Sequence, residues 1–223
     1  MNHLIKPLSR WALTTAFIAF VLSSCRRESL VVSTENRLSA TTSASTSINE
    51  GGNSAAAHIA ASEKLVLPAS VGLPQNLPAG NSRVATFYAV GVQKYKARIK
   101  AGSDPVVYEW VFVAPQANLY DSDNKLVGTH GAGPFWELSA ADSIFAQQFS
   151  SPKTAPSPDP ESIDWLLLMP KAGTTPTGIF ADVDYIQRIA TKGGKAPLTS
   201  PADINETVSV KYKAVYRFTK KNP

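Results

Sequence analysis

The segment that most constrains the fold is the alternating run from Val208 to Thr219. Its apolar side chains recur at every second position, and Ser209, Lys211, Lys213, Arg217 and Thr219 occupy most of the positions between them. Successive side chains of a β-strand point to opposite faces, so a period of two predicts a strand with one buried face. The end of the chain is therefore expected to be a long, half-buried strand.

Other segments predict further strands. Residues 84–99 follow a similar pattern, and Val106 to Ala114 is so continuously apolar that it predicts a strand covered on both faces. The polar run 121–125 predicts a hairpin turn. Shorter strands are expected at Phe135–Leu138, Ser143–Phe149, Trp165–Met169 and Gly178–Thr191, with a Pro-rich surface loop at Ser151–Pro160 and a tight turn at Gly193 and Gly194. No long amphipathic helix is expected, so we predict an all-β antiparallel sandwich or barrel.

The amino terminus has the layout of a secretory signal. Lys6 and Arg10 precede an apolar run from Trp11 to Leu22, which is shorter than the roughly 20 residues of a spanning helix. The sequence Leu22-Ser23-Ser24-Cys25 resembles a bacterial lipobox, in which cleavage leaves an acylated cysteine. We therefore expect residues 1–24 to be a lipoprotein signal peptide, with a plain signal peptide as the alternative.

Cys25 is the only cysteine in the sequence, so it cannot close an internal disulfide. Acyl chains on Cys25 would hold the chain on membrane lipid without a second signal. Arg26 and Arg27 follow where an aspartate would retain a lipoprotein at the inner membrane of enteric bacteria. The expected location is the cell envelope, in the outer membrane.

Residues 25–62 are expected to form a disordered tether, because they are rich in Ser, Thr, Ala, Asn and Gly and offer little apolar surface to bury. His58 lies in this segment and is given no role. The domain is expected over residues 63–223, beginning with an extended Leu-Pro-rich strap at 65–80.

Composition argues against several classes of function. The formal net charge is +5, and two of those charges, Lys6 and Arg10, lie in the predicted signal. Basic residues are spread along the chain, so nucleic acid is not an expected partner. His130 is the only histidine of residues 63–223, which also lack cysteine, so neither a metal site nor a cofactor is predicted.

The segment Gly128 to Glu137 offers the best candidate site. One interpretation places His130 and Glu137 at a pocket rim, with Trp136 as a stacking platform for a small molecule or glycan. The alternative is a glycine-rich corner whose Trp136 fills the core. Arg188 could hold a ligand carboxylate or phosphate, or could instead form an ion pair at the edge of the sheet.

Two other kinds of function stay open. A hydrolase would need paired carboxylates, and Asp142, Asp164, Asp182 and Asp184 could converge in space with Glu137 nearby. The third possibility is a structural domain that binds another envelope protein.

Several segments in register resemble the uncharacterised family known as domain of unknown function 3455. They are Gly91–Tyr95, Trp110–Pro115, Gly128–Glu137, Trp165–Leu168, Ile186–Arg188 and Thr191–Gly194. The resemblance covers about Val84 to Phe218 and implies no activity. The resemblance also implies two cysteines in relatives, at positions where this chain has Ala97 and the stretch Leu198–Ser200. If those cysteines pair in relatives, this chain has lost both partners and must hold the two segments together by packing.

Overall fold

The computed structural model describes residues 49–76 and 79–223. Cys25, the predicted signal at 1–24 and the first part of the predicted tether lie outside these residues. None of the helices in the described ranges is long and apolar enough to cross a membrane.

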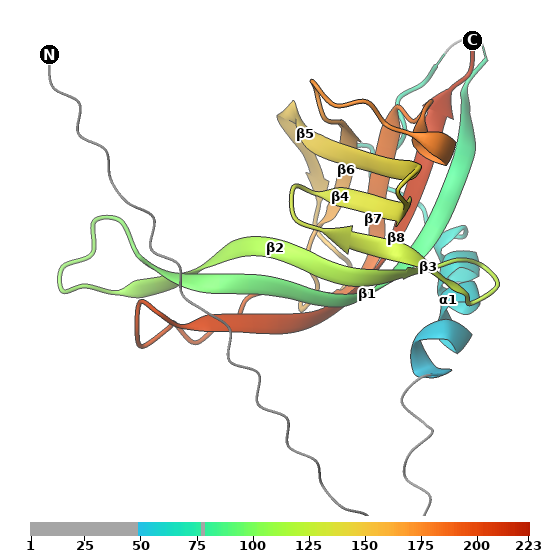
Figure 1. Cartoon of the computed structure of the whole chain (residues 1–223). Helices are drawn as coiled ribbons and strands as arrows, with labels where there is room; N and C mark the ends of the chain where they lie inside the picture. The colour runs from blue at the N-terminus through green and yellow to red at the C-terminus, as the bar shows by residue number, and fades with distance from the viewer. Residues whose placement is uncertain (1–48, 77–78) are drawn as a thin grey trace, which may run out of the picture. The chain divides into compact units, whose positions relative to one another are not determined.

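Eight antiparallel strands close into a barrel in sequence order, with each strand bonded to the next and β8 bonded to β1 (Figure 1). The strands are β1 (Asn81–Ile99), β2 (Tyr108–Tyr120), β3 (Leu126–Gly131), β4 (Phe135–Ser139), β5 (Asp142–Ala155), β6 (Trp165–Pro170), β7 (Tyr185–Gly193) and β8 (Thr207–Lys221). The all-β prediction is confirmed, and the barrel is the form it takes. Closure leaves no free edge where the two ends of the sheet meet.

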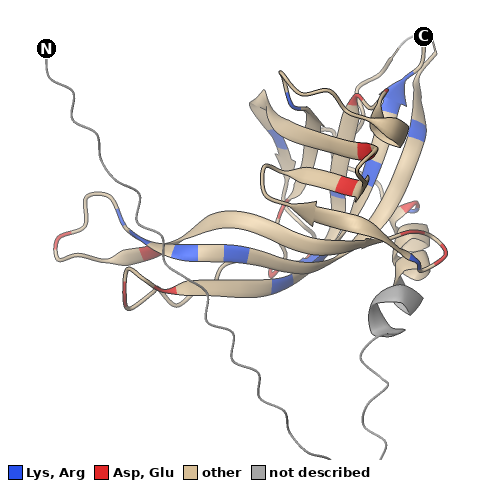
Figure 2. Ribbon diagram, viewed as in Figure 1, with Lys and Arg blue, Asp and Glu red and all other residues tan. Residues whose placement is uncertain are grey.

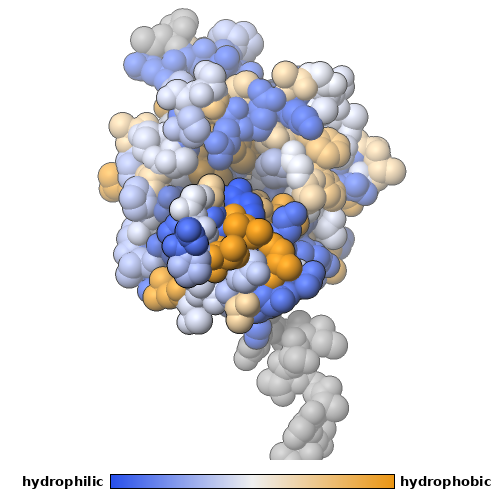
Figure 3. Space-filling view, turned by 90° about the vertical axis from the view of Figure 1, so that its left-hand side faces the viewer, coloured by the Kyte–Doolittle hydropathy of each residue, from blue (hydrophilic) through white to orange (hydrophobic). Residues whose placement is uncertain are grey.

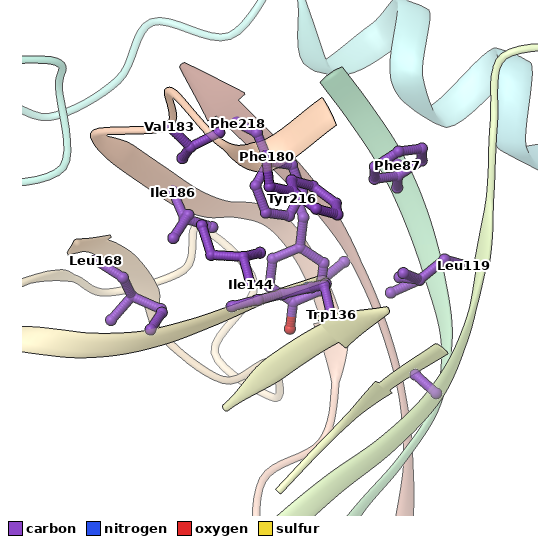
Figure 4. Packing of buried hydrophobic residues seen from close by; sticks show 14 of the residues in the cluster. Phe87, Leu119, Trp136, Ile144, Leu168, Phe180, Val183, Ile186, Tyr216 and Phe218 are labelled. Atoms are coloured by element: carbon purple, nitrogen blue, oxygen red, sulfur yellow. The ribbon is translucent and has the colours of Figure 1, made fainter. Parts of the chain in front are cut away.

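Aromatic side chains fill one end of the barrel. Phe87 of β1 packs edge-on to Phe180 and Phe218, with ring centroids 6.4 and 5.8 Å apart (Figure 4). Phe180 belongs to the 3₁₀ turn η1 (Gly178–Phe180) and is completely buried. The turn thus plugs this end with a side chain from outside the sheet.

A helix, α1 (Asn49–Ser62), packs on the outer face of the barrel. Ala55 and Ile59 are buried in a second apolar cluster with Tyr88 of β1 and Val215 of β8. The prediction of a tether extending to Ser62 was therefore wrong for residues 49–62, and packed structure begins before residue 63. Ala55 and Ile59 lie four positions apart, so they share one face of the helix and pack against the outer face of β1 and β8. Such tertiary packing can stabilise a helix even where its helical propensity is weak.

His58 of α1 also has a structural contact that the sequence did not suggest. Its ring stacks on Tyr88 at a centroid distance of 4.5 Å and an angle of 8°. The chain after α1 continues over the same face, where Val71 is fully buried and its carbonyl oxygen accepts a hydrogen bond from Gln187 Nε2 at 2.8 Å.

This cover explains why the outer positions of β8 are not exposed. Val215, Arg217 and Thr219 are all buried, although the alternating pattern predicted a solvent-facing side. Arg217 donates to Ser62 Oγ at 3.2 Å and pairs with Glu63 at 3.3 Å. Burial lowers the pKa of Arg217, and the nearby Glu63 carboxylate opposes that effect.

The ends of β1, β2 and β8 extend beyond the barrel as a three-stranded arm (Figure 1). The prediction that Val106–Ala114 is covered on both faces was wrong: β2 begins at Tyr108, and Phe112 and Val113 are 52% and 51% exposed. Basic side chains follow β1 along the arm (Figure 2), and Arg98 pairs with Glu109 at 2.6 Å.

Two other boundaries differ from the predictions. The strand expected at Gly178–Thr191 begins only at Tyr185, because residues 178–180 form η1 and Gly178 has a φ of 57°. β5 continues into the predicted Pro-rich loop as far as Ala155, after a shift in register between Gln148 and Lys153. The tight turn predicted at Gly193 and Gly194 is not formed: Gly193 is the last residue of β7 and Gly194 forms an isolated bridge with Ser162, although both have positive φ.

Gly91 of β1 pairs with Ala117 and lies in close contact with β2. A Cβ added at this position would lie 2.0 Å from the carbonyl oxygen of Gln116 and 2.5 Å from Cα of Ala117. We expect Gly91→Ala to lower the free energy of unfolding by about 1–3 kcal/mol, the usual cost of overpacking. Chemical denaturation measures it, with Gly72→Ala as the control, since neither glycine has a positive φ and a Cβ at Gly72 meets nothing nearer than 3.6 Å. Equal losses in both variants would show that contact with β2 does not set the cost.

Candidate functional site

The other end of the barrel contains a cavity of about 200 Å³. Strands β2 to β8 all contribute to its lining. The wall is mainly apolar, with Phe112, Leu166 and Leu168 among its residues, and its polar side chains are His130, Gln148, Arg188 and Tyr216. The side of the molecule on which the arm projects is hollowed at its centre (Figure 3).

A second, larger cavity of about 420 Å³ adjoins the first. The two share Phe112, Gln148, Leu166 and Arg188, and the second is also lined by Gln93 and Tyr95 of β1. We call the first the inner cavity and the second the vestibule. Together they form one space in the lumen that all eight strands line.

His130 is held in a fixed orientation in the wall of the inner cavity. Its Nδ1 lies 2.7 Å from the carbonyl oxygen of Phe135, which can only accept, so Nδ1 carries the proton. Nε2 then accepts a hydrogen bond from the Tyr216 hydroxyl at 3.0 Å. Burial lowers the pKa of His130 to about 4, against the opposing effect of the Phe135 carbonyl, so the ring is neutral near pH 7.

Tyr216 connects His130 with Arg188 across the lumen. Burial raises the pKa of the Tyr216 hydroxyl, whereas the positive charge of Arg188 lowers it. Tyr212, two residues earlier on β8, has a pKa raised by burial and by its neighbour Tyr216. Both phenols therefore stay protonated near neutral pH and can act as hydrogen-bond donors.

Trp136 separates the cavity from the aromatic core. It is fully buried, stacks on His130 at 4.5 Å and 13°, and meets Tyr216 and Phe218 edge-on at 5.1 and 5.5 Å. Figure 4 shows it beside Tyr216 and below Phe218. Trp136 is thus part of the core, as the alternative interpretation of its loop expected. Its indole Nε1 has no hydrogen-bond partner among the described residues.

Arg188 lies on β7, facing the lumen beside both cavities. Its Nε and Nη2 donate to the carbonyl oxygen of Asp164 at 3.2 and 2.7 Å. Within the described part of the chain it forms no ion pair with a carboxylate, unlike Arg83, Arg98 and Arg217. The ion pair considered as an alternative from the sequence is not formed.

Glu137 is separated from the other candidates. It is exposed and follows Trp136 on β4, so its side chain lies on the opposite face of the strand, outside the lumen. The structure therefore brings together His130, Trp136 and Arg188, with Tyr216 and Gln148 added, and leaves Glu137 out.

The carboxylates considered for hydrolysis have other contacts. Asp142 accepts from Ser139 Oγ at 2.6 Å and from the Ile179 amide at 3.0 Å, and these bonds lower its pKa. Asp184 accepts from the Lys221 amide and Asp182 lies 3.9 Å from Lys220. Asp164 alone among the four lines the vestibule, and no Asp or Glu lines the inner cavity. The described residues contain no cluster of metal-ligand type.

Sequence reasoning missed Tyr216, Gln148 and Phe112. Tyr216 is 86 positions from its hydrogen-bond partner His130. It was assigned only to the apolar face of its strand, and nothing in a single strand's pattern tells whether that face meets a packed core or a cavity.

Residues 78–220 match the profile of the family described as "Protein of unknown function (DUF3455)". The chain belongs to this family. No curated protein and no solved structure matches it.

The DUF3455 match spans the barrel up to the last residue but one of β8, and it includes every residue that lines the two cavities. The two sites where the resemblance implies cysteines in relatives are linked here through Trp110. Ala97 pairs with Trp110 across β1 and β2, and Trp110 Nε1 donates to the Thr199 carbonyl at 2.9 Å. Packing and one hydrogen bond thus join these segments in this chain.

Proposed function

We propose that this protein binds a small molecule in the lumen of its barrel and is held at the cell envelope by an acylated Cys25. The observation that carries the binding role is the cavity, which places a guanidinium without a carboxylate partner among apolar walls. The anchor rests on the sequence of residues 1–25 alone.

Unpaired polar groups in the lumen support a binding role. Trp136, which lines the inner cavity, and Gln93, which lines the vestibule, each carry a buried side-chain N–H donor without a partner among the described residues. A buried donor left unpaired costs about 1–3 kcal/mol. A ligand that accepts from these groups would recover part of that cost. A small ligand site is expected to combine apolar walls with a few such polar groups.

A small molecule fits the lumen better than a glycan does. Glycan sites commonly offer an aromatic face for stacking, which was the role considered for Trp136. Both that indole and the His130 ring on which it stacks are buried, at 0% and 4% exposure. The inner cavity of about 200 Å³ is of the size that holds one ring, since a cavity of about 150 Å³ binds benzene.

The test is a thermal-shift titration of the full chain with indole and benzyl alcohol, two neutral single-ring probes. A ligand at about one hundred times its dissociation constant should add about 2.7 kcal/mol to the free energy of unfolding. For a domain of this size that is a rise in Tm of about 5–10 °C.

A plugging variant locates the binding. Gln148→Trp places a large side chain where the two cavities meet, and it should abolish the shift. Gln116→Trp is the matched control, because Gln116 is an exposed residue of β2 that lines neither cavity. Equal shifts in wild type and the plugged variant would place binding outside the lumen and refute the proposal, as would no shift in wild type.

A further inference from the structure

The guanidinium of Arg188 has donors left for a ligand. Arginine carries five N–H groups in a fixed fork. Two of them, on Nε and Nη2, are directed at the Asp164 carbonyl oxygen. Three remain, and one of them is hydrogen-bonded to the Tyr216 hydroxyl oxygen. Two N–H groups are therefore left to donate to an acceptor with two oxygens.

The charge of Arg188 is not balanced inside the lumen. Among the residues that the structure describes, no acidic side chain lines the inner cavity, and the vestibule has one, Asp164, together with one further cation, Lys195. The electrostatic effect of Arg188 reaches four groups: it opposes the rise in pKa that burial causes at Tyr95, Tyr212 and Tyr216, and it adds to the fall in pKa that burial causes at His130. A positive charge that acts on groups all round a low-dielectric space is complementary to an anion.

The anion that fits is a single negative charge. Neutral His130 adds no second cation to the inner cavity, so Arg188 is the only cation that the described part of the chain contributes to its lining. A phosphate monoester would bring a charge of about −1.5 to −2 into this space. A carboxylate brings one charge, and its two oxygens match the guanidinium fork.

We propose that the ligand is a small apolar carboxylic acid whose carboxylate is bound by Arg188 and whose ring or branched chain lies in the inner cavity. Its body packs against Phe112, Leu166 and Leu168. The side-chain amide of Gln148, which lines the same cavity, donates to the carboxylate as well. This ligand class rests on the proposed function of the lumen and narrows it.

The test compares isosteric acid and amide pairs on the full chain. Benzoate and benzamide have the same size and differ in charge, as do phenylacetate and phenylacetamide. Calorimetric titration near pH 7 should show the acids binding about 10- to 100-fold more tightly than the amides, as expected for a hydrogen-bonded charge. Phenyl phosphate, the third member of the set, should bind more weakly than benzoate.

Substitution of Arg188 separates its charge from the rest of the cavity. Arg188→Gln should lose the preference for acids while keeping the affinity for benzamide, which also reports that the cavity is intact. Arg188→Lys should keep part of the preference. Arg98→Gln is the matched control, because it removes the same charge from an exposed ion pair on the arm.

The outcomes distinguish the ligand class from the proposed function. Amides that bind as tightly as acids, an acid preference that survives Arg188→Gln, or tighter binding of phenyl phosphate would each overturn the carboxylate assignment and leave lumen binding in place. Failure of acids and amides alike, with indole and benzyl alcohol still bound, overturns this inference alone. If no probe binds at all, the proposed function falls with it.

Discussion

Trp136→Ala is expected to lower the free energy of unfolding by about 3–5 kcal/mol, the range measured for truncating large buried aromatic side chains. The indole is fully buried and contacts the rings of His130, Tyr216 and Phe218. Removing it leaves a void between the core and the inner cavity that the closed sheet cannot collapse to fill. Guanidinium unfolding of the full chain, followed by circular dichroism, measures the loss.

Trp110 provides the control for this prediction. It is also a tryptophan of the barrel sheet, but it lies on the arm, is only half-buried and donates one hydrogen bond to the Thr199 carbonyl. We expect Trp110→Ala to cost about half as much or less. If Trp136→Ala is no more destabilising than Trp110→Ala, the indole is not part of the core, and the rim position first considered for it is the better description.

This result also affects how ligand binding can be tested. A large loss of stability in Trp136→Ala would reduce binding of any ligand, whether or not the indole touches it. Arg188 and Gln148 are better positions for such tests, because both line the lumen and neither is fully buried.

The strands were predictable because their signal is local. A period of two along 208–219 identifies β8, and the polar run at 121–125 identifies the β2–β3 turn, without knowledge of what each segment packs against. The limits of the arm were not predictable in this way. An apolar run such as 106–114 looks the same whether it is covered by the protein or extends beyond the barrel, and here Phe112 and Val113 are half exposed.

Helix α1 was missed because its packing signal is weak and non-local. Ala55, Ile59 and Ser62 follow the spacing of a helical face, but only Ile59 is a large apolar residue, and Gly51 and Gly52 lower the local helical propensity. The helix is stabilised by the outer face of β1 and β8, which the sequence pattern assigned to solvent. The missed helix and the wrongly predicted exposed face of β8 therefore have one cause. Val215 and Arg217 of β8 are buried because α1 packs on them.

The candidate site could be predicted only in part, for a related reason. His130, Trp136 and Arg188 were identified because histidine, tryptophan and arginine are few and chemically capable. Which of them meet depends on closure of the barrel, which brings β3, β4, β7 and β8 around one lumen. Glu137 was included through its nearness in sequence to Trp136, yet in a strand the adjacent position points to the opposite face.

The stability of the protein is expected to fall by about 3 kcal/mol between pH 7 and pH 4, and His130 is the expected cause. In the unfolded chain a histidine binds a proton with a pKa near 6.5, whereas burial lowers the pKa of His130 in the folded protein to about 4. Between these two values the unfolded state binds a proton that the folded state does not. Stability is therefore complete above about pH 6.5 and is lost as the pH falls toward 4, by up to about 1.4 kcal/mol for each pH unit.

Other titrating groups with shifted pKa act mostly outside this window or more weakly. Hydrogen bonds are the main cause of lowered pKa values at three carboxylates, Asp142, Asp159 and Glu63. Their contributions to the stability of the fold are therefore present above about pH 4 and are lost below it. His58 also has a pKa lowered by burial and by Lys213 and Lys192, but it is much less buried than His130.

His130→Gln isolates the effect, because glutamine offers a donor and an acceptor and stays neutral at every pH. Unfolding free energies of wild type, His130→Gln and the control His58→Gln are measured at half-unit steps from pH 7.5 to 4.5. The quantity compared is the slope of the unfolding free energy against pH, so a loss of stability in His130→Gln that is the same at every pH does not affect the comparison. This slope should be largely removed in His130→Gln and largely retained in His58→Gln. A wild-type slope that persists in His130→Gln would show that His130 accepts a proton in the folded barrel, and its ring would then be in contact with solvent or an anion in the lumen.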